Sequence, residues 1–258
     1  MDPELLLQVL SDVASRVRSS LDDLDDWGPS GGKPGQYRSD VAADAVALEV
    51  LVGAGLSVLS EESGVTGDLE SELLAVLDPV DGSTNASRGI PWYATSICVL
   101  DREGPLCSLV VNQADGTRYE AVRGQGALRD GAHIGPGVPV HLDRAVVGLA
   151  GYPPRALGWR QFRALGAAAL DLCAVADGTL DAYVDCSADA HGPWDYLGGF
   201  LVCREAGAHV ADAEGRELVL RTGGERRLPV AASSRNLLEE MLSARRAAFS
   251  PEAPAAPS

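Results

Sequence analysis

The segment that most suggests chemistry is residues 77–85 (LDPVDGSTN), where Asp78 and Asp81 follow a run of apolar residues. Carboxylate and carbonyl oxygens are the ligands that Mg²⁺ prefers, so Asp78, Asp81 and the Val80 carbonyl group form a candidate metal site. Because Pro79 has no N–H group for a central ladder, we expect the strand to end there and to expose the carboxylates at a sheet edge. A β-turn at Asp81 and a strand-end cap at Asp78 are the alternative interpretation.

A candidate anion site follows directly. Gly82, Ser83 and Thr84 allow a turn and provide capping hydroxyl groups, which predicts that a short helix begins here. The N–H groups at a helix N-terminus point outward and can bind phosphate. The segment therefore places a phosphate cradle beside a cation site.

Acidic residues also stand at two other expected element ends. Glu61 and Glu62 follow a short apolar strand at residues 56–59, and Asp195 opens an apolar helix. Solvated surface would also explain the two glutamates, and favourable charge at a helix N-terminus would also explain Asp195. Strand ends and helix starts of an α/β fold converge on one crevice, however. We therefore expect these carboxylates to share a crevice with the two aspartates.

Two helices and a buried strand are expected to position this cluster. Apolar residues at helical spacing predict a helix over residues 5–24. A second helix is expected to begin at Ser39 or Asp40, either of which could cap it, and to run to about residue 52. The apolar run at residues 73–77 is typical of a strand buried on both faces.

The rest of the chain alternates between strand and helix patterns. Alternating apolar residues predict an antiparallel meander of strands at 93–100, 106–112, 118–122 and 126–128. Further on we expect strands at 146–149, 182–184 and 230–232, and helices at 164–176, 195–206 and 236–246. This order predicts a mixed α/β layered fold with helices between two sheets, followed by a disordered Pro/Ala-rich tail at 250–258.

Composition narrows the function classes. A chain of 258 residues can bury a large core, as one α/β domain or as two subdomains that share one cleft. Its formal net charge of -16 argues against non-specific nucleic-acid binding, but not against a phosphate substrate that binds through cations. Five scattered cysteines without a C-x-x-C pair predict reduced thiols in a cytoplasmic protein. Neither a secretory signal nor a membrane-spanning run is visible.

Together these motifs resemble the inositol monophosphatase family of lithium-sensitive, magnesium-dependent phosphatases. The resemblance covers most of the chain and rests on residues 61–63 (EES), 78–85 (DPVDGSTN), 165–171 (LGAAALD) and 193–195 (PWD). It implies an α/β (α+β) fold, a five-layered α-β-α-β-α sandwich of the sugar-phosphatase type. It also implies one domain at 1–249, whose subdomains, roughly 1–142 and 143–249, share the metal cleft.

The resemblance implies two or three Mg²⁺ ions, with Mn²⁺ as a substitute. Glu61, Asp78 and the Val80 carbonyl group would hold the first ion. Asp78, Asp81 and Asp195 would hold the second, and a third would share Glu61. A water activated by the metals would attack phosphorus directly, without a phosphoenzyme.

Further roles carry over by the same resemblance. Ser83 and Glu61 would orient the attacking water, and Asp40 would accept the hydroxyl proton of Ser83; a helix N-cap is the other interpretation of Asp40. The backbone N–H groups of Gly82, Ser83 and Thr84 would bind the phosphate. No histidine is needed, and the four histidines are expected to be surface or structural residues: His133, His141, His191 and His209.

The substrate-binding wall departs from the family pattern. Asp185 matches a carboxylate that binds substrate hydroxyl groups in the family. Its spacing to Asp195 is longer than in animal members of the family. The alternative is that Asp185 is a loop aspartate that binds no ligand. Gly166, Ala167 and Ala168 are expected to face the substrate at a helix start. The connection over residues 151–165 is short and lacks most of a helix, so we expect it to open or reshape one wall of the pocket.

The expected function is hydrolysis of a small polyol phosphate, with inositol 1-phosphate as the first candidate. Histidinol phosphate, fructose 1,6-bisphosphate, another sugar or cyclitol phosphate, and 3'-phosphoadenosine 5'-phosphate are alternative substrates. A non-catalytic regulatory binding protein is the alternative of another class. The family resemblance also implies a homodimer, and neither a nucleic acid nor a membrane is expected as a partner.

Overall fold

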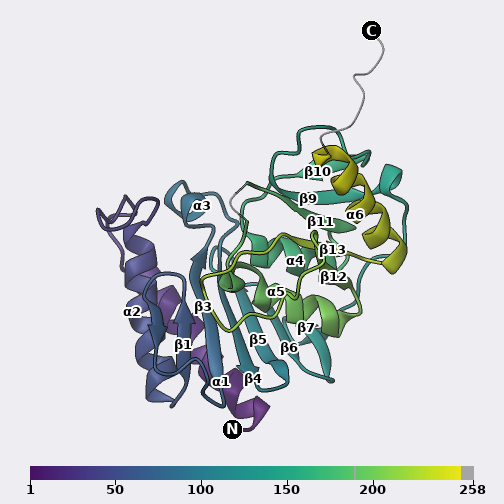
Figure 1. Cartoon of the computed structure of the whole chain (residues 1–258). Coiled ribbons are helices and arrows are strands. Elements are labelled where there is room, and N and C mark those ends of the chain that lie inside the picture. Colours follow the sequence, from purple (N-terminus) through teal and green to yellow (C-terminus); the bar gives the residue numbers. More distant parts are fainter. Residues whose placement is uncertain (189, 251–258) are drawn as a thin grey trace.

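Two β-sheets and the helices around them form the computed structural model, which describes residues 1–188 and 190–250 (Figure 1). Within these residues, an eight-stranded sheet has the order β2-β1-β3-β4-β5-β6-β7-β8. Its strands are β1 (Ser57–Ser60), β2 (Gly64–Thr66), β3 (Leu74–Asp81), β4 (Ala94–Asp101), β5 (Gly104–Asn112), β6 (Arg118–Val122), β7 (Gly126–Arg129) and β8 (Ala132–His133).

A smaller sheet and the helices complete the described chain. The five-stranded sheet has the order β10-β9-β11-β13-β12 among the described residues. Its strands are β9 (Val146–Gly151), β10 (Gln161–Arg163), β11 (Ala182–Cys186), β12 (His209–Asp212) and β13 (Pro229–Ala232). The helices are α1 (Pro3–Asp22), α2 (Arg38–Gly53), α3 (Ser83–Ser87), the 3₁₀ turn η1 (Leu142–Arg144), α4 (Ala168–Ala176), α5 (Pro193–Ala206) and α6 (Arg235–Phe249).

The elements stack in five layers (Figure 1). Helices α1 and α2 bury their apolar faces against one side of the larger sheet. Helices α4 and α5 pack on its other side, between the two sheets. Helix α6 covers the outer face of the smaller sheet. This arrangement confirms the α/β fold class and the five-layered α-β-α-β-α sandwich expected from the resemblance.

Helix α5 approaches its neighbours closely through two glycines. A Cβ atom at Gly198 would lie 2.5 Å from Ser96 Oγ in β4, and one at Gly199 would lie 2.6 Å from Leu172 Cβ in α4. Such distances leave no room for a side chain. The glycine pair therefore allows α5 to pack closely against both the larger sheet and α4.

The predicted meander is present, since β4 to β7 pair in succession and antiparallel. The predicted start of α4 is wrong, because this helix begins at Ala168 and not at residue 164. Gly166 has φ of +88°, and Ala167 is extended with φ of -143°, so neither residue has helical geometry. Short strands β2, β8, β10 and β12 were not predicted, because runs of two to four residues give little periodicity.

The expectation that the acidic strand ends at Pro79 is also wrong. Strand β3 continues to Asp81, with a register shift between Asp78, which faces Ser96, and Asp81, which faces Ala94. Proline can occupy such a bulge because no ladder hydrogen bond is required of it there. The Thr95 hydroxyl group donates to the Pro79 carbonyl oxygen at 2.9 Å. The aspartates are consequently buried within the sheet and not exposed at its outer edge.

The structure bears on the cysteines and on the helices, and it leaves most of the C-terminal tail undescribed. All five cysteines are free and buried, which agrees with reduced thiols that fill the core. Among the described helices, none combines the length and the apolar character needed to cross a membrane. Most of the predicted disordered tail, residues 251–258, lies outside the described residues.

Candidate metal centre and substrate cavity

Three of the predicted metal ligands come together in space. Glu61, Asp78 and Asp195 each bring one carboxylate oxygen to within 4.8 Å of the others. Asp78 is buried, Asp195 is half-buried and Glu61 reaches solvent, so the cluster has a closed side and an open side. Hard carboxylate oxygens at this spacing suit a divalent cation such as Mg²⁺. The donor set therefore fits the metal that the sequence predicts.

The local fold explains why these residues meet. Strand β1 pairs with β3 only as far as Ser60 opposite Leu77, which leaves the following part of β3 open on that side. The Glu61 N–H group donates to the Leu77 carbonyl oxygen at 3.1 Å, so Glu61 leaves the sheet next to Asp78. Asp195 lies in the first turn of α5 and accepts the Gly192 N–H group at 2.6 Å. Strand ends and a helix start thus converge, as expected.

Asp81 and Val80 lie on the same strand but differ in their partners. Asp81 accepts the Ala169 N–H group at 2.7 Å, in the first turn of α4. Val80 is buried, and its N–H group donates to Asp78 Oδ1 at 3.0 Å. The bulge of β3 therefore holds the Asp78 carboxylate against its own backbone, while Asp81 faces a helix N-terminus that favours its charge.

The carboxyl groups of the acidic cluster and Asp81 lie close enough to repel one another when they are charged. Burial and the neighbouring carboxylates raise the pKa of Asp81 to about 8 and the pKa of Asp78 well above its ordinary value. Glu61 reaches solvent, yet partial burial of its carboxyl group and the charges of Asp195, Glu62 and Asp81 raise its pKa to about 8. A bound cation would remove this repulsion, because it favours the charged form of every carboxylate around it.

The predicted phosphate-binding segment forms α3, a five-residue helix that begins after Gly82. Gly82 has φ of +88°, and a Cβ atom there would lie 3.0 Å from the Trp92 carbonyl oxygen. Glycine is therefore required on both conformational and steric grounds. The Thr84 hydroxyl group lies 3.2 Å from the Tyr37 hydroxyl group, which ties α3 to the start of α2.

Asp40 lies in the first turn of α2, and its side chain accepts a hydrogen bond from the backbone at the start of that helix. The helix begins at Arg38 with Tyr37 as its N-cap, so the prediction that Ser39 or Asp40 is the cap is wrong by two or three residues. Asp40 accepts the Tyr37 N–H group at 2.8 Å, and burial raises its pKa to about 6. Asp40 and Ser83 line the same polar cavity, which has a volume of about 430 Å³ and also borders Glu61. The Ser83 hydroxyl group opposes the rise in the Asp40 pKa, which places the two side chains near each other.

A second cavity, with a volume of about 290 Å³, borders Asp81 and His191 next to the acidic cluster. Gly166, Ala167 and Ala168 line it together with Asp81, which agrees with their predicted position at a helix start. Asn85 holds this wall in place, because its side-chain amide donates to the Leu165 carbonyl oxygen at 2.7 Å. We call this space the site cavity.

Asp185 is not among the residues that line the site cavity. It lies on β11 and is fully buried, and its Oδ1 atom accepts the N–H and hydroxyl groups of Ser187. Its Oδ2 atom has no hydrogen-bond partner within the described residues and lies 3.5 Å from His191 Nε2. Any effect of Asp185 on a ligand is therefore expected to pass through His191.

His191 is the site residue that sequence reasoning missed. It lines the site cavity, its Nδ1 atom lies 3.5 Å from Asp195 Oδ2, and its Nε2 atom lies 3.0 Å from the Tyr183 hydroxyl group. Burial opposes a charge on His191, but hydrogen bonding to Asp195 and the charges of Asp195 and Asp185 raise its pKa to about 9. His191 is therefore not only a surface or structural residue, because it contacts carboxylates beside the acidic cluster. The four-residue spacing of His191 and Asp195 was the signal in the sequence that could have indicated the first of these contacts.

Comparison with known proteins places these features in a wider group. The sequence profile of the inositol monophosphatase family matches residues 45–249. The chain is 32% identical, over 84% of its length and 88% of the relative, to the fructose-1,6-bisphosphatase/inositol-1-monophosphatase of Archaeoglobus fulgidus. It is 30% identical, over 71% of its length and 74% of the relative, to Nus factor SuhB of Escherichia coli. A solved structure from Pyrococcus horikoshii, described as similar to inositol-1 monophosphatase, superposes with a TM-score of 0.80 at 26% identity, over 93% of this chain and 96% of that one.

Proposed function

Because the chain belongs to the inositol monophosphatase family and is thus a phosphoric monoester hydrolase, we propose that it hydrolyses a small polyol phosphate in a Mg²⁺-dependent reaction. Inositol 1-phosphate is the reference substrate of the proposal. The main support is the cluster of Glu61, Asp78 and Asp195 carboxylates, which lies beside a cavity large enough for a small alcohol.

In the proposed reaction, the acidic residues hold the metal ions. Glu61, Asp78 and the Val80 carbonyl group would bind one ion, and Asp78, Asp81 and Asp195 would bind another. When bound, Mg²⁺ supplies positive charge and Lewis acidity at the phosphate group. Its binding also accounts for carboxylates that would otherwise repel one another.

The remaining residues position the phosphate and the water. The N–H groups of Gly82, Ser83 and Thr84 would bind phosphate oxygens at the start of α3. With a pKa of about 6, Asp40 is charged at neutral pH and can accept the Ser83 hydroxyl proton. The Ser83 oxygen would then accept a hydrogen bond from the attacking water, with Glu61 as a second acceptor. This arrangement orients the water toward phosphorus.

Asp185 and His191 are predicted to act together on substrate hydroxyl groups. Asp185→Asn is expected to raise KM for inositol 1-phosphate about fivefold while leaving kcat/KM for 4-nitrophenyl phosphate, which has no ring hydroxyl group, nearly unchanged. The reason is that Asp185 lies 3.5 Å from His191, which lines the site cavity. Steady-state kinetics on both substrates, repeated with His191→Gln, would check the shared role.

Asp181→Asn provides the matched control, since Asp181 stands just before β11 and accepts the Val146 N–H group at 2.8 Å. That variant should keep both KM values. If Asp185→Asn impairs both substrates equally, the role in hydroxyl recognition is rejected and a purely structural role remains.

The proposed function is tested by phosphate release from a panel of phosphorylated metabolites, each measured with Mg²⁺ and with EDTA. Turnover that requires Mg²⁺ and is strongest on inositol 1-phosphate supports the proposal as stated. Turnover concentrated on histidinol phosphate, fructose 1,6-bisphosphate, another sugar phosphate or 3'-phosphoadenosine 5'-phosphate keeps the reaction and changes the substrate.

A regulatory binding role is the second candidate, and the similarity to a protein named Nus factor SuhB favours it. Phosphate release from none of the panel compounds, with or without Mg²⁺, would favour this alternative. We also propose a homodimer and a single folded unit at residues 1–249. Analytical ultracentrifugation and a two-state unfolding transition would test these two points.

A further inference from the structure

One buried carboxylate beside the site cavity has no role in the proposed reaction. Asp171 lies in the first turn of α4, is only 2% exposed, and lines the site cavity together with Ala167 and Ala168. The two alanines precede Asp171 by four and three residues, a spacing that brings side chains to one face of a helix. Asp171 is therefore a candidate contact for the alcohol part of the substrate.

The two oxygens of this carboxylate differ in their partners. The indole N–H group of Trp92 donates to Asp171 Oδ1 at 2.8 Å and so fixes the orientation of the carboxyl group. Within residues 1–188 and 190–250, Oδ2 accepts no hydrogen bond, and no basic side chain forms an ion pair with Asp171. His191 shares the cavity, but its ring nitrogens lie beside Asp185 and Asp195. A buried carboxylate without a cationic partner is unfavourable, so Asp171 is poised to bind one.

The lining of the site cavity favours a cationic group over an anionic one. None of the described residues that line it is a lysine or an arginine, and apart from Asp171 its polar members are Asp81, Tyr183 and His191. The other lining residues are small or apolar, and such walls strengthen charge interactions by lowering the local dielectric constant. A second phosphate group on the substrate would meet Asp171 without a cation to bind it.

The protonation equilibrium of Asp171 also responds to a cation. Burial raises the pKa of Asp171 to about 7, although the hydrogen bond from Trp92 and the charge of His191 oppose the rise. A carboxyl group with this pKa is about half charged at neutral pH. A cation that enters the cavity would favour the charged form. A hydroxyl group or a water molecule can also donate to Oδ2, but only a cation offsets the charge as well.

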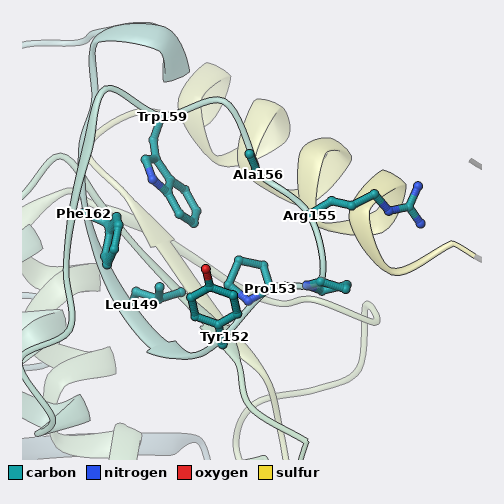
Figure 2. A pocket seen from close by; sticks show the side chains of 8 residues that line it. Leu149, Tyr152, Pro153, Arg155, Ala156, Trp159 and Phe162 are labelled. Carbon is teal, nitrogen blue, oxygen red and sulfur yellow. The ribbon is translucent and has the colours of Figure 1, made fainter. Parts of the chain in front are cut away.

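A more apolar cavity on the other face of the smaller sheet does not extend this site. Figure 2 shows the rings of Tyr152, Trp159 and Phe162 around that space, above Leu149. Leu149 and Trp159 belong to the apolar cluster that α6 covers, whereas α4 carries Asp171 on the side between the two sheets. The alcohol part that reaches Asp171 is therefore expected to be compact, within the 290 Å³ or so of the site cavity.

We propose that Asp171 binds an ammonium group carried by the alcohol part of the substrate. The inference rests on the proposed phosphatase function, because the phosphate group would bind at the acidic cluster while the ammonium group pairs with Asp171. Asp81 lines the same cavity, so one small molecule can reach both places. The inference narrows the substrate class to phosphate monoesters of compact amino alcohols.

The test compares ω-aminoalkyl phosphates with n-alkyl phosphates in which a methyl group replaces the ammonium group. The linkers are long enough that the ammonium group does not acidify the leaving alcohol, and an ω-hydroxyalkyl phosphate completes each set. For the best linker, we expect the ammonium group to raise kcat/KM about tenfold over the methyl group. In Asp171→Asn this ratio should fall to about one, because the introduced amide can still accept the Trp92 N–H group but carries no charge.

Asp177→Asn is the matched control, since Asp177 is a buried carboxylate at the other end of α4 that does not line the site cavity. That variant should keep the tenfold preference. The same sets are also compared as non-hydrolysable phosphonates by calorimetry with Mg²⁺, which requires no turnover. The comparisons on the wild type remain decisive even if Asp171→Asn fails to fold.

If the ammonium group gives no gain in rate or affinity while alkyl phosphates are hydrolysed, the inference fails and the phosphatase function stands. An equal gain from the hydroxyl group, lost to the same extent in Asp171→Asn, would overturn the ammonium class. A loss in Asp171→Asn that is equal for all three substrates would leave Asp171 a structural role alone. If no ester is hydrolysed, the proposed function fails, and calorimetry alone decides whether Asp171 binds the ammonium group.

Discussion

Asp81→Asn is expected to yield a folded protein whose phosphatase kcat/KM is about 10³-fold lower than that of the wild type. The substitution removes one proposed metal ligand and replaces a carboxyl group beside the acidic cluster by a neutral amide. The fold should persist, because the side-chain carbonyl group of the introduced asparagine can still accept the Ala169 N–H group that Asp81 accepts at 2.7 Å. Steady-state kinetics at saturating Mg²⁺ would measure the loss, and circular dichroism would confirm the fold.

Asp177→Asn is the matched control for this experiment. Asp177 is also a buried carboxylate, but it lies at the opposite end of α4, where it accepts the Tyr119 hydroxyl group at 2.9 Å and pairs with Arg129. Its substitution removes the same charge and should change kcat/KM by less than about twofold. If Asp81→Asn retains wild-type activity, the assignment of Asp81 as a metal ligand is wrong.

The same inactive variant should be more stable than the wild type when metal is absent. The pKa of Asp81 is about 8 in the folded protein, against about 4 for an aspartate in an unfolded chain. Between these values the folded state keeps a proton that the unfolded state has released, so the free energy of unfolding falls as the pH rises from about 4 to 8. Asparagine carries no such charge. After allowance for the weaker bond to Ala169, we expect Asp81→Asn to gain about 2 kcal/mol at pH 8.

Thermal unfolding in EDTA at pH 5 and pH 8 would show this behaviour. The two proteins should unfold at similar temperatures at pH 5, and the variant should unfold about 5 °C higher at pH 8. Excess Mg²⁺ should reverse the order, because the ion stabilises only a folded state that binds it. A wild type that grows more stable from pH 5 to pH 8 in EDTA would contradict the repulsion described for the cluster.

The sequence was sufficient to predict the layers and most of the acidic cluster. Apolar runs identified β3 and α5, and the carboxylates at their ends had to meet because such ends share a crevice in this class of fold. The meander of β4 to β7 was predicted from alternating segments separated by turn residues. These features depend on local patterns that repeat along the chain, which is why a single sequence reveals them.

The errors arose where tertiary contacts override local rules. A bulge in β3 accommodates Pro79, and the positive φ of Gly166 delays the start of α4. His191 lies beside both Asp195 and Asp185, and the contact with Asp185 on β11 depends on the tertiary structure. The short connection after β9 was visible in the sequence, but not the gathering of its aromatic side chains around one space, because that depends on the backbone path.

The close packing of α5 that Gly198 and Gly199 allow also affects which divalent cation the acidic cluster should bind. Asp195 stands on a helix that packs closely against β4 and α4, and Asp78 stands on the sheet that this helix contacts. Closely packed elements therefore set the gap between these two carboxylates, whereas Glu61 lies on the open side. Mg²⁺ binds oxygen at about 2.0–2.1 Å and Ca²⁺ at about 2.3–2.6 Å. Close packing on this side of the cluster should therefore favour the smaller Mg²⁺ over Ca²⁺.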